Sequence, residues 1–322
     1  MSDYKTIKGW TVEAVASDPA NPGVGQVWYY STSGTMKAYG YLLGAGSWSA
    51  GGSLATQRRY GSVAGTQTAT ITTGGGPNIT ACELYNGTSW TASPASINYG
   101  YHTSAGFGIQ TAAMTVGGPG QVLSETWDGT SWAEGNNINT PGNFGLGSGT
   151  TTAGLTAFAE NSPPIGLNSE TYDGTSWSEG NNVLTKRYGG GQSSGVNTNA
   201  MMSSGYNTPG GVGTLVESWN GTSWVEENNV NTGRYHANGA GTGSSMIMFG
   251  GTPAPGVGAL VEQWNGTSWT EVADLTTARF GPGGAGTTLA AVCTAGATPV
   301  SSLATEEWNA PAGNTTQTFT SS

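Results

Sequence analysis

Charged residues are scarce in this sequence, which has 322 residues and only 9% Asp, Glu, Lys and Arg. Lys and Arg number 9 against 19 Asp and Glu, so the formal net charge is −10. A protein that binds nucleic acid by neutralising phosphates needs a basic face, and so few cations spread along the chain do not make one. We therefore expect no nucleic-acid partner.

Cysteine and histidine are nearly absent, with 2 residues of each. Cys82 and Cys293 cannot form a disulfide framework, and no Cys-x-x-Cys pair occurs. We expect both to be buried small residues in strands. His102 and His236 occupy the same place in two copies of the repeat described below, where they could face each other across a channel, but a third metal ligand is not apparent. The sequence therefore predicts no metal and no cofactor.

Long apolar runs are also missing. No stretch approaches the ~18 apolar residues of a membrane-spanning helix, so we expect no membrane partner. The first ten residues, MSDYKTIKGW, lack the apolar core of a signal peptide. We therefore expect a protein that is not secreted through a cleaved leader.

Glycine and tryptophan are abundant, with 55 and 12 residues, and aromatic residues make up 10% of the chain. Glycine inside a helix costs ~1 kcal/mol relative to alanine. It is common in the tight turns that join short strands. This composition predicts an all-β protein with many turns.

One phrase recurs along the chain, Glu-x-aromatic-Asn/Asp-Gly-Thr-Ser-Trp. It spans residues 83–90, 125–132, 170–177, 217–224 and 262–269, and a truncated copy ends the series at 306–309. The repeat length is roughly 44 residues. The aromatic residues of the phrase are Tyr85, Trp90, Trp127, Trp132, Tyr172, Trp177, Trp219, Trp224, Trp264, Trp269 and Trp308. We interpret them as structural residues that pack between neighbouring sheets.

Each copy divides into four short strands, which in the first copy we place at residues 60–65, 68–73, 82–85 and 89–92. The Asn-Gly or Asp-Gly step between the third and fourth strands predicts a tight hairpin in which both turn residues have positive φ. Four antiparallel strands repeated six times are typical of the blades of a β-propeller. Stacking the blades around an axis buries their faces, and closing the ring removes the need for end caps.

Two charged residues also recur once per copy. An arginine precedes an aromatic residue at Arg59, Arg187, Arg234 and Arg279, and each phrase begins with a glutamate. One residue per blade would form a ring rather than a pocket. We therefore predict that these residues brace the strands. Because no copy carries a distinctive acid–base pair, we predict no catalytic residue and no enzymatic activity.

The repeat resembles a known family. A Gly-Gly pair after an apolar strand, then Glu-x-Tyr/Trp-Asn/Asp and a later Trp, is similar to the kelch repeat. The phrases Asn-Gly-Thr-Ser-Trp, Asn-x-Asn-Thr-x-Arg and Ala-Gly-Thr-x-Thr-Ala, with the opening at residues 17–30, more closely resemble kelch-like structural proteins of marine tailed bacteriophages. The resemblance spans about residues 17–309 and implies a propeller fold and a place in a phage virion.

The expected architecture is a kelch-like β-propeller of six four-stranded blades, with N-terminal strand material completing the last blade. A seventh blade is the alternative, if residues 26–48 pair with the tail at 312–322. We expect an N-terminal attachment segment at 1–25, the propeller at 26–309, and a C-terminal tail at 310–322 that could join the closing blade.

The expected function is that of a non-enzymatic virion protein in the tail, the fibre or the capsid surface, made in the host cytoplasm. It would serve attachment to a host-surface glycan or protein, or the architecture of the particle. It would be present in multiple copies and would contact other virion proteins through residues 1–25. The alternatives are a polysaccharide-degrading tail enzyme and a cellular kelch interaction module.

Any partner surface is expected on the propeller face that carries the loops after the second and fourth strands, because these loops vary among the copies. The candidate binding residues are Asn161, Pro163, Pro164, Tyr206, Asn207, Pro253 and Pro255.

Overall fold

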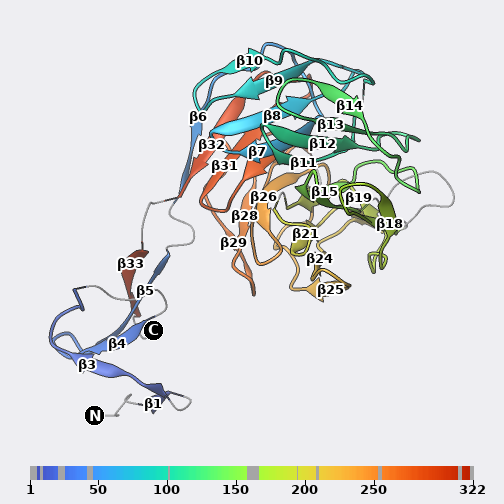
Figure 1. Cartoon of the computed structure of the whole chain (residues 1–322). Helices are drawn as coiled ribbons and strands as arrows, with labels where there is room; N and C mark the ends of the chain where they lie inside the picture. The colour runs from blue at the N-terminus through green and yellow to red at the C-terminus, as the bar shows by residue number, and fades with distance from the viewer. Residues whose placement is uncertain are drawn as a thin grey trace. The chain divides into compact units, whose positions relative to one another are not determined.

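The computed structural model describes residues 6–7, 10–20, 26–41, 46–100, 102–157, 167–193, 195–207, 210–252, 256–310 and 314–319. Every regular element in these ranges is a β-strand (Figure 1). No helix in the described ranges is long and apolar enough to cross a membrane.

The chain divides into two compact units. The terminal unit comprises residues 1–45 and 311–322, and the propeller unit comprises residues 46–310. This division differs from the expected boundaries at 25/26 and 309/310, because much of the segment after residue 26 belongs to the terminal unit.

The described part of the terminal unit contains one four-stranded sheet, in the order β3-β4-β5-β33, and one two-stranded sheet. In the larger sheet β3 is parallel to β4, whereas β5 is antiparallel to both β4 and β33. The strands are β1 (Thr6–Ile7), β2 (Trp10–Thr11), β3 (Glu13–Val15), β4 (Val27–Tyr30), β5 (Thr35–Tyr41) and β33 (Asn314–Phe319). The tail thus pairs with N-terminal residues, as the seven-blade alternative supposed, but in the terminal unit and not as a blade of the ring.

Within its described residues, the propeller unit contains six four-stranded antiparallel sheets, here called blades 1 to 6. Blade 1 is β7 (Ser62–Thr66), β8 (Ala69–Thr73), β9 (Cys82–Tyr85) and β10 (Trp90–Ala92). Blade 2 is β11 (Ala105–Ile109), β12 (Ala112–Val116), β13 (Ser124–Trp127) and β14 (Trp132–Glu134). Blade 3 is β15 (Leu146–Thr150), β16 (Ala153–Ala157), β17 (Ser169–Tyr172) and β18 (Trp177–Glu179).

Blade 4 is β20 (Gly191–Gln192), β21 (Ala200–Ser203), β24 (Val216–Trp219) and β25 (Trp224–Glu227). Blade 5 is β26 (Asn238–Thr242), β27 (Ser245–Phe249), β28 (Val261–Trp264) and β29 (Trp269–Glu271). Blade 6 is β30 (Gly283–Gly286), β31 (Ala290–Thr294), β32 (Thr305–Asn309) and β6 (Ser47–Ala50). A small extra sheet beside blade 4 is formed by β19 (Arg187–Tyr188), β22 (Tyr206–Asn207) and β23 (Gly211–Val212).

The ring of blades is closed by a strand from the N-terminal side of the unit. Among the first strands, β7 contacts β11, β11 contacts β15, β20 contacts β26, β26 contacts β30, and β30 contacts β7. The blades thus follow one another around an axis (Figure 1). In blade 6 the fourth strand is β6, where Trp48 lies opposite Trp308. The expected six-bladed ring, closed by N-terminal strand material, is therefore confirmed.

The repeated aromatic residues lie between blades. All eleven are buried, and within each complete phrase the two rings lie 4.8 to 5.5 Å apart. Trp127 and Trp132 of blade 2, for example, pack on Ala64 and Ile71 of blade 1. The same arrangement joins the other blades, and Tyr85 and Trp90 of blade 1 pack on Ala295 of blade 6. Such wedges bury ~150–250 Å² per ring.

The hairpin that joins the third and fourth strands differs from the expected two-residue turn. In blade 1 the last strand pair is Tyr85 and Trp90, so the loop has four residues. Gly87 has a φ of 88°, and Asn86 is not among the residues with positive φ. The Asn86 Oδ1 instead accepts hydrogen bonds from the backbone N–H groups of Thr88 and Ser89, both at 2.9 Å. The Asn or Asp of the phrase thus holds the turn through its side chain.

The repeated glutamates anchor the segment that leads into each blade. Each carboxylate is buried and accepts two backbone N–H groups from that segment, as Glu262 does from Asn231 at 2.8 Å and Thr232 at 3.3 Å. The six glutamates are Glu83, Glu125, Glu170, Glu217, Glu262 and Glu306. Their predicted bracing role is therefore confirmed.

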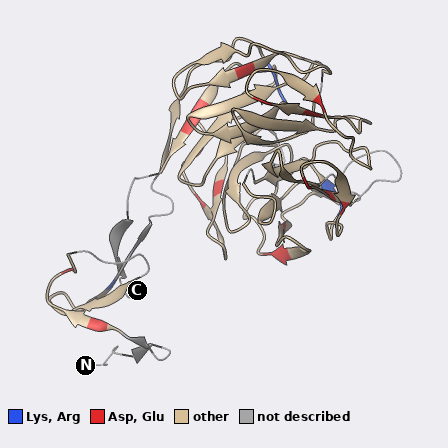
Figure 2. Cartoon of the chain, in the orientation of Figure 1, with Lys and Arg blue, Asp and Glu red and all other residues tan. Residues whose placement is uncertain are grey.

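A buried arginine pairs with the glutamate in four blades. The ion pairs are Arg58–Glu83 at 2.8 Å, Arg187–Glu217 at 2.9 Å, Arg234–Glu262 at 3.0 Å, and Arg279–Glu306. In blade 1 the bracing residue is thus Arg58 and not the predicted Arg59, because the sequence has two arginines in succession there. Figure 2 shows that charged residues occupy few segments of the described chain.

Candidate functional site

The axis of the propeller unit is surrounded by one residue per blade whose backbone is left-handed. These residues have φ between 50° and 64°, and they are Tyr60, Thr103, Phe144, Gly189, His236 and Gly281. Backbone hydrogen bonds of 2.8 Å link neighbours, from Tyr60 N to Gly281 O, from Thr103 N to Tyr60 O, and from Phe144 N to Thr103 O. We call this set the axial ring. It fixes the side chains that line the centre of the propeller.

Large and small side chains alternate around the axial ring. Blades 1, 3 and 5 contribute Tyr60, Phe144 and His236, whereas blades 2, 4 and 6 contribute Thr103, Gly189 and Gly281. The three large rings contact one another. The Tyr60 and Phe144 centroids are 5.3 Å apart, the Phe144 and His236 rings stack at 4.8 Å, and the Tyr60 and His236 centroids are 4.9 Å apart. These three side chains form a plug in the axis.

The two glycines of the axial ring leave the space that the plug fills. A Cβ atom on Gly281 would lie 2.4 Å from Cε1 of Tyr60, and one on Gly189 would lie 2.7 Å from Cδ2 of His236. The left-handed backbone and the lack of a side chain are therefore both required at these positions.

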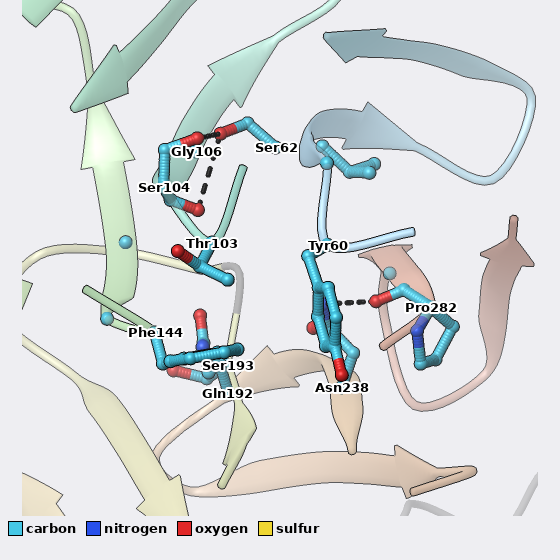
Figure 3. A pocket seen from close by; sticks show the side chains of 15 residues that line it. Tyr60, Ser62, Thr103, Ser104, Gly106, Phe144, Gln192, Ser193, Asn238 and Pro282 are labelled. Atoms are coloured by element: carbon cyan, nitrogen blue, oxygen red, sulfur yellow. Dashed lines mark hydrogen bonds between the residues drawn. The ribbon is translucent and has the colours of Figure 1, made fainter. Parts of the chain in front are cut away.

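A small chamber on the axis adjoins the plug (Figure 3). It has a volume of about 50 Å³, and Tyr60, Phe144 and Thr103 lie along it with the polar residues Gln192 and Ser193. Further polar groups bond to one another, as Ser62 Oγ does to Ser104 Oγ at 2.7 Å and as Asn238 Nδ2 does to Pro282 O at 3.0 Å. The chamber has room for a few water-sized molecules and no larger ligand.

Burial shifts the titration of the plug. The pKa of His236 is lowered to about 4 by burial, with a smaller contribution from the positive charge of Arg59. Burial also raises the pKa of Tyr60 well above its ordinary value. The two side chains are hydrogen bonded at 3.0 Å between Tyr60 Oη and His236 Nδ1. Both groups are therefore neutral at pH 7.

The His236 pKa predicts a loss of stability in mild acid. The ordinary histidine pKa is 6.5, so between pH 6.5 and 4 the unfolded chain binds a proton that the folded chain does not. The His236 contribution to the free energy of unfolding should be constant above pH 7 and should fall by about 2 kcal/mol on acidification to pH 5. Urea unfolding at the two pH values measures this. In His236→Phe, which keeps a ring in the plug, that part of the decrease should vanish. An unchanged decrease in this variant would contradict the assignment.

The residue that precedes the axial ring differs between the two halves of the propeller. In blades 1, 2 and 3 it is polar, namely Arg59, His102 and Asn143. In blades 4, 5 and 6 it is aromatic, namely Tyr188, Tyr235 and Phe280. All six side chains are partly exposed. The position therefore breaks the repeat symmetry at an accessible place next to the axis.

The three polar side chains line one recess, which we call the polar recess. It has a volume of about 400 Å³, and Tyr60 and Phe144 of the plug also border it. Asn78, from the loop between β8 and β9, contributes a further amide whose Oδ1 lies 3.0 Å from Nδ1 of His102. A neighbouring recess of about 450 Å³ shares Asn78 and His102 and adds Tyr99 and Gln121. The two recesses thus adjoin through common residues.

Two expectations about this region are wrong in register. The arginine–aromatic pattern puts Tyr60 in register with Tyr188, but the axial ring places Tyr60 one residue further along, at the position of Gly189, and Phe144 lies at that position too. For the same reason His102 and His236 are not equivalent, since His102 precedes the ring and His236 belongs to it. The doublet Arg58-Arg59 indicates the correct register, because aligning Arg58 with Arg187 makes Arg59 equivalent to Tyr188.

Most of the predicted binding-loop residues lie outside the described residues, namely Asn161, Pro163, Pro164, Pro253 and Pro255. Tyr206 and Asn207 are described and form β22, which pairs with Arg187 and Tyr188. The Tyr206 ring lies 5.4 Å from Tyr188 and 5.6 Å from Tyr235. Tyr206 therefore extends the aromatic half of the position before the axial ring.

Cys82 and Cys293 are buried in strands, as expected. No group of three or more His, Cys, Asp or Glu within the described ranges could hold a metal ion.

Comparison with solved structures supports the arrangement of the blades. A structure titled "Structure of YjhT" superimposes with a TM-score of 0.66 at 12% sequence identity, covering 82% of this chain and 99% of that one. The chain is a β-propeller. At this identity the likeness shows the fold alone. No protein-family model and no curated protein matches the sequence.

Proposed function

We propose that this propeller is a non-enzymatic structural protein of a marine tailed-phage virion, in the tail, the fibre or the capsid surface. It attaches the particle to a host surface or contributes to the particle's architecture. The support from the sequence is the resemblance of its kelch-like phrases to such phage proteins. The support from the structure is the way in which the propeller is inserted into the chain.

The insertion is the observation that carries the proposal. β5 and β33 pair over six residues in the terminal unit, and the whole propeller unit lies between them in sequence. The first and last strands of the propeller unit, β6 and β32, are also paired with each other. The chain thus enters and leaves the ring at adjacent strands. A module connected in this way suits presentation on a larger particle, with the terminal unit as the attachment to other virion proteins.

The buried charged residues that recur in the repeat support a structural role. All six repeated glutamates hold backbone N–H groups, and four of them also hold a buried arginine. These carboxylates are engaged in bracing the blades and do not face the polar recess. The propeller therefore serves as a rigid scaffold whose loops are available for recognition.

Mass spectrometry and antibody labelling of purified virions test the proposal. The chain is expected in the particles in multiple copies and at a fixed ratio to the major capsid protein. Recovery of the chain only in the particle-free fraction of the lysate would contradict a virion role. Cleavage of host polysaccharide by the purified chain would instead favour the polysaccharide-degrading alternative.

A further inference from the structure

The broken symmetry before the axial ring points to a ligand. Blades 1 to 6 have the same strand order and comparable aromatic wedges, and in each blade this position leads into the axial ring. Tyr188, Tyr235 and Phe280 show that an aromatic ring satisfies it. Three adjacent blades nevertheless carry nitrogen-bearing polar side chains here, and all three line the polar recess. Packing around the axis does not require polar side chains at these three positions, whereas recognition of a polar ligand does.

The charge of the polar recess indicates that the ligand carries a negative charge. The arginines at 58, 187, 234 and 279 are buried and neutralised by glutamates. Arg59 has no carboxylate partner within the described residues, and its guanidinium lies 5.8 Å from the Tyr60 ring centroid and 5.9 Å from that of Phe280. Two aromatic rings thus hold the guanidinium beside the recess, in a protein of net charge −10. A guanidinium binds carboxylate and sulfate oxygens with paired hydrogen bonds.

The other walls suit a ring that carries hydroxyl groups. Asn78, His102 and Asn143 offer hydrogen-bond donors and acceptors, and Phe144 and Pro77 offer apolar surface. Tyr99, which is 44% exposed, borders the adjoining recess. The volume of about 400 Å³ falls in the range of small-molecule sites. A single cation with several amides and aromatic rings does not match a polyphosphate, which needs more positive charge.

We propose that the polar recess binds a sugar residue that carries one anionic group, a carboxylate or a sulfate, with Arg59 as the anion-binding residue. The proposal deepens the proposed function, on which it rests, by naming the class of host-surface glycan to which the virion would attach. His102 and Asn143 would bind hydroxyl groups, and Phe144 would contact the apolar face of the sugar.

The two histidines allow a direct test with the unaltered full chain. His102 lines the recess, whereas His236 lies in the plug, and the chain has 2 histidines in all. Proton–carbon NMR of the histidine rings is recorded during titration with glucuronic acid, glucose 6-sulfate and glucose. We expect the two anionic sugars to shift the His102 resonance in a saturable manner and to shift His236 less. Glucose should bind at least ~10-fold more weakly. A His102 resonance that none of the three sugars moves would overturn the proposal.

Variants separate recognition from general electrostatic attraction. Arg59→Gln should weaken binding of the anionic sugars at least ~10-fold and leave the weak binding of glucose unchanged. Lys186→Gln removes an equal charge from the segment before Arg187, in a blade of the aromatic half, and should change neither. Equal losses in the two variants would mean that only net charge matters. Thermal unfolding checks that each variant is folded, and Asn143→Ala, which removes an amide from the same wall, provides a second recess variant that should weaken all three sugars.

The two proposals fail in distinguishable ways. If the chain is found in virions but none of the sugars binds, the glycan class is wrong and the virion role stands. If acidic sugars bind at the polar recess but the chain is absent from virions, the site stands and its proposed setting is wrong.

Discussion

Glu262→Ala is expected to lower the free energy of unfolding by about 3–5 kcal/mol. The Glu262 carboxylate accepts two backbone N–H groups and pairs with the buried Arg234 at 3.0 Å. Burial lowers the pKa of Arg234, and Glu262 opposes that shift. Removing the carboxylate leaves a guanidinium buried without its counter-charge, which is the costly way to break a buried ion pair. Chemical unfolding followed by tryptophan fluorescence measures the loss.

Two matched variants locate the source of this cost. Glu271→Ala removes the exposed carboxylate directly opposite Glu262 on the next strand and should change stability by less than ~0.5 kcal/mol. Glu125→Ala removes the same backbone anchor in blade 2, where Tyr101 replaces the arginine in sequence, so its cost should be about 1–3 kcal/mol. Equal losses in Glu262→Ala and Glu125→Ala would contradict a special contribution from the ion pair.

Gly281→Ala is expected to cost about 2–4 kcal/mol. Gly281 has a φ of 59°, and its new Cβ would lie 2.4 Å from a Tyr60 ring carbon. A left-handed alanine costs ~1–2 kcal/mol, and overpacking adds ~1–3 kcal/mol. Gly120 provides the control, because it has a φ of 69° and nothing within 4 Å of a Cβ.

The comparison isolates the close approach in the plug. Gly120→Ala should show the backbone cost alone, about 1–2 kcal/mol. Adding Tyr60→Thr, the type of residue that blade 2 carries at Thr103, should reduce the extra cost of Gly281→Ala. If Gly281→Ala and Gly120→Ala unfold at the same denaturant concentration, the alternation of large and small residues does not fill the axis as described.

The sequence predicted the blades well because their signals are local. The Asn/Asp-Gly-Thr-Ser loop and the flanking aromatic residues fall within eight residues of one another, so each copy can be recognised alone. The closing strand could also be predicted, because Gly46-Ser47-Trp48 matches the start of a fourth strand. In the structure Trp48 lies opposite Trp308. The two-residue hairpin was wrong because the side chain of Asn86, and not a second positive φ, holds that loop.

The arrangement at the centre of the propeller could not be predicted from the sequence, because it depends on contacts between residues that are distant in sequence. Tyr60, Phe144 and His236 occupy left-handed positions that are unfavourable for each residue alone, and contacts between blades distant in sequence sustain them. Similarly, Ser204 and Ala295 have φ of 63° and 61°, where blades 1, 2 and 5 have glycine. A Gly-Gly pattern therefore does not identify these two equivalent turns. The polar recess could not be predicted either, because only the axial ring shows that Arg59, His102 and Asn143 occupy equivalent positions.

Strand β6 provides the most direct test of the closed ring. Ser47 and Asn309 are direct partners across β6 and β32, and both are exposed. Opposite residues of an antiparallel pair lie within the Cα separation that a disulfide spans. Mass mapping of the oxidised variant Ser47→Cys/Asn309→Cys should find these two positions joined within one chain, whereas Ser47→Cys/Ala310→Cys, shifted by one residue, should stay reduced. Free thiols in the first variant, or equal oxidation of the second, would contradict closure of the propeller by β6.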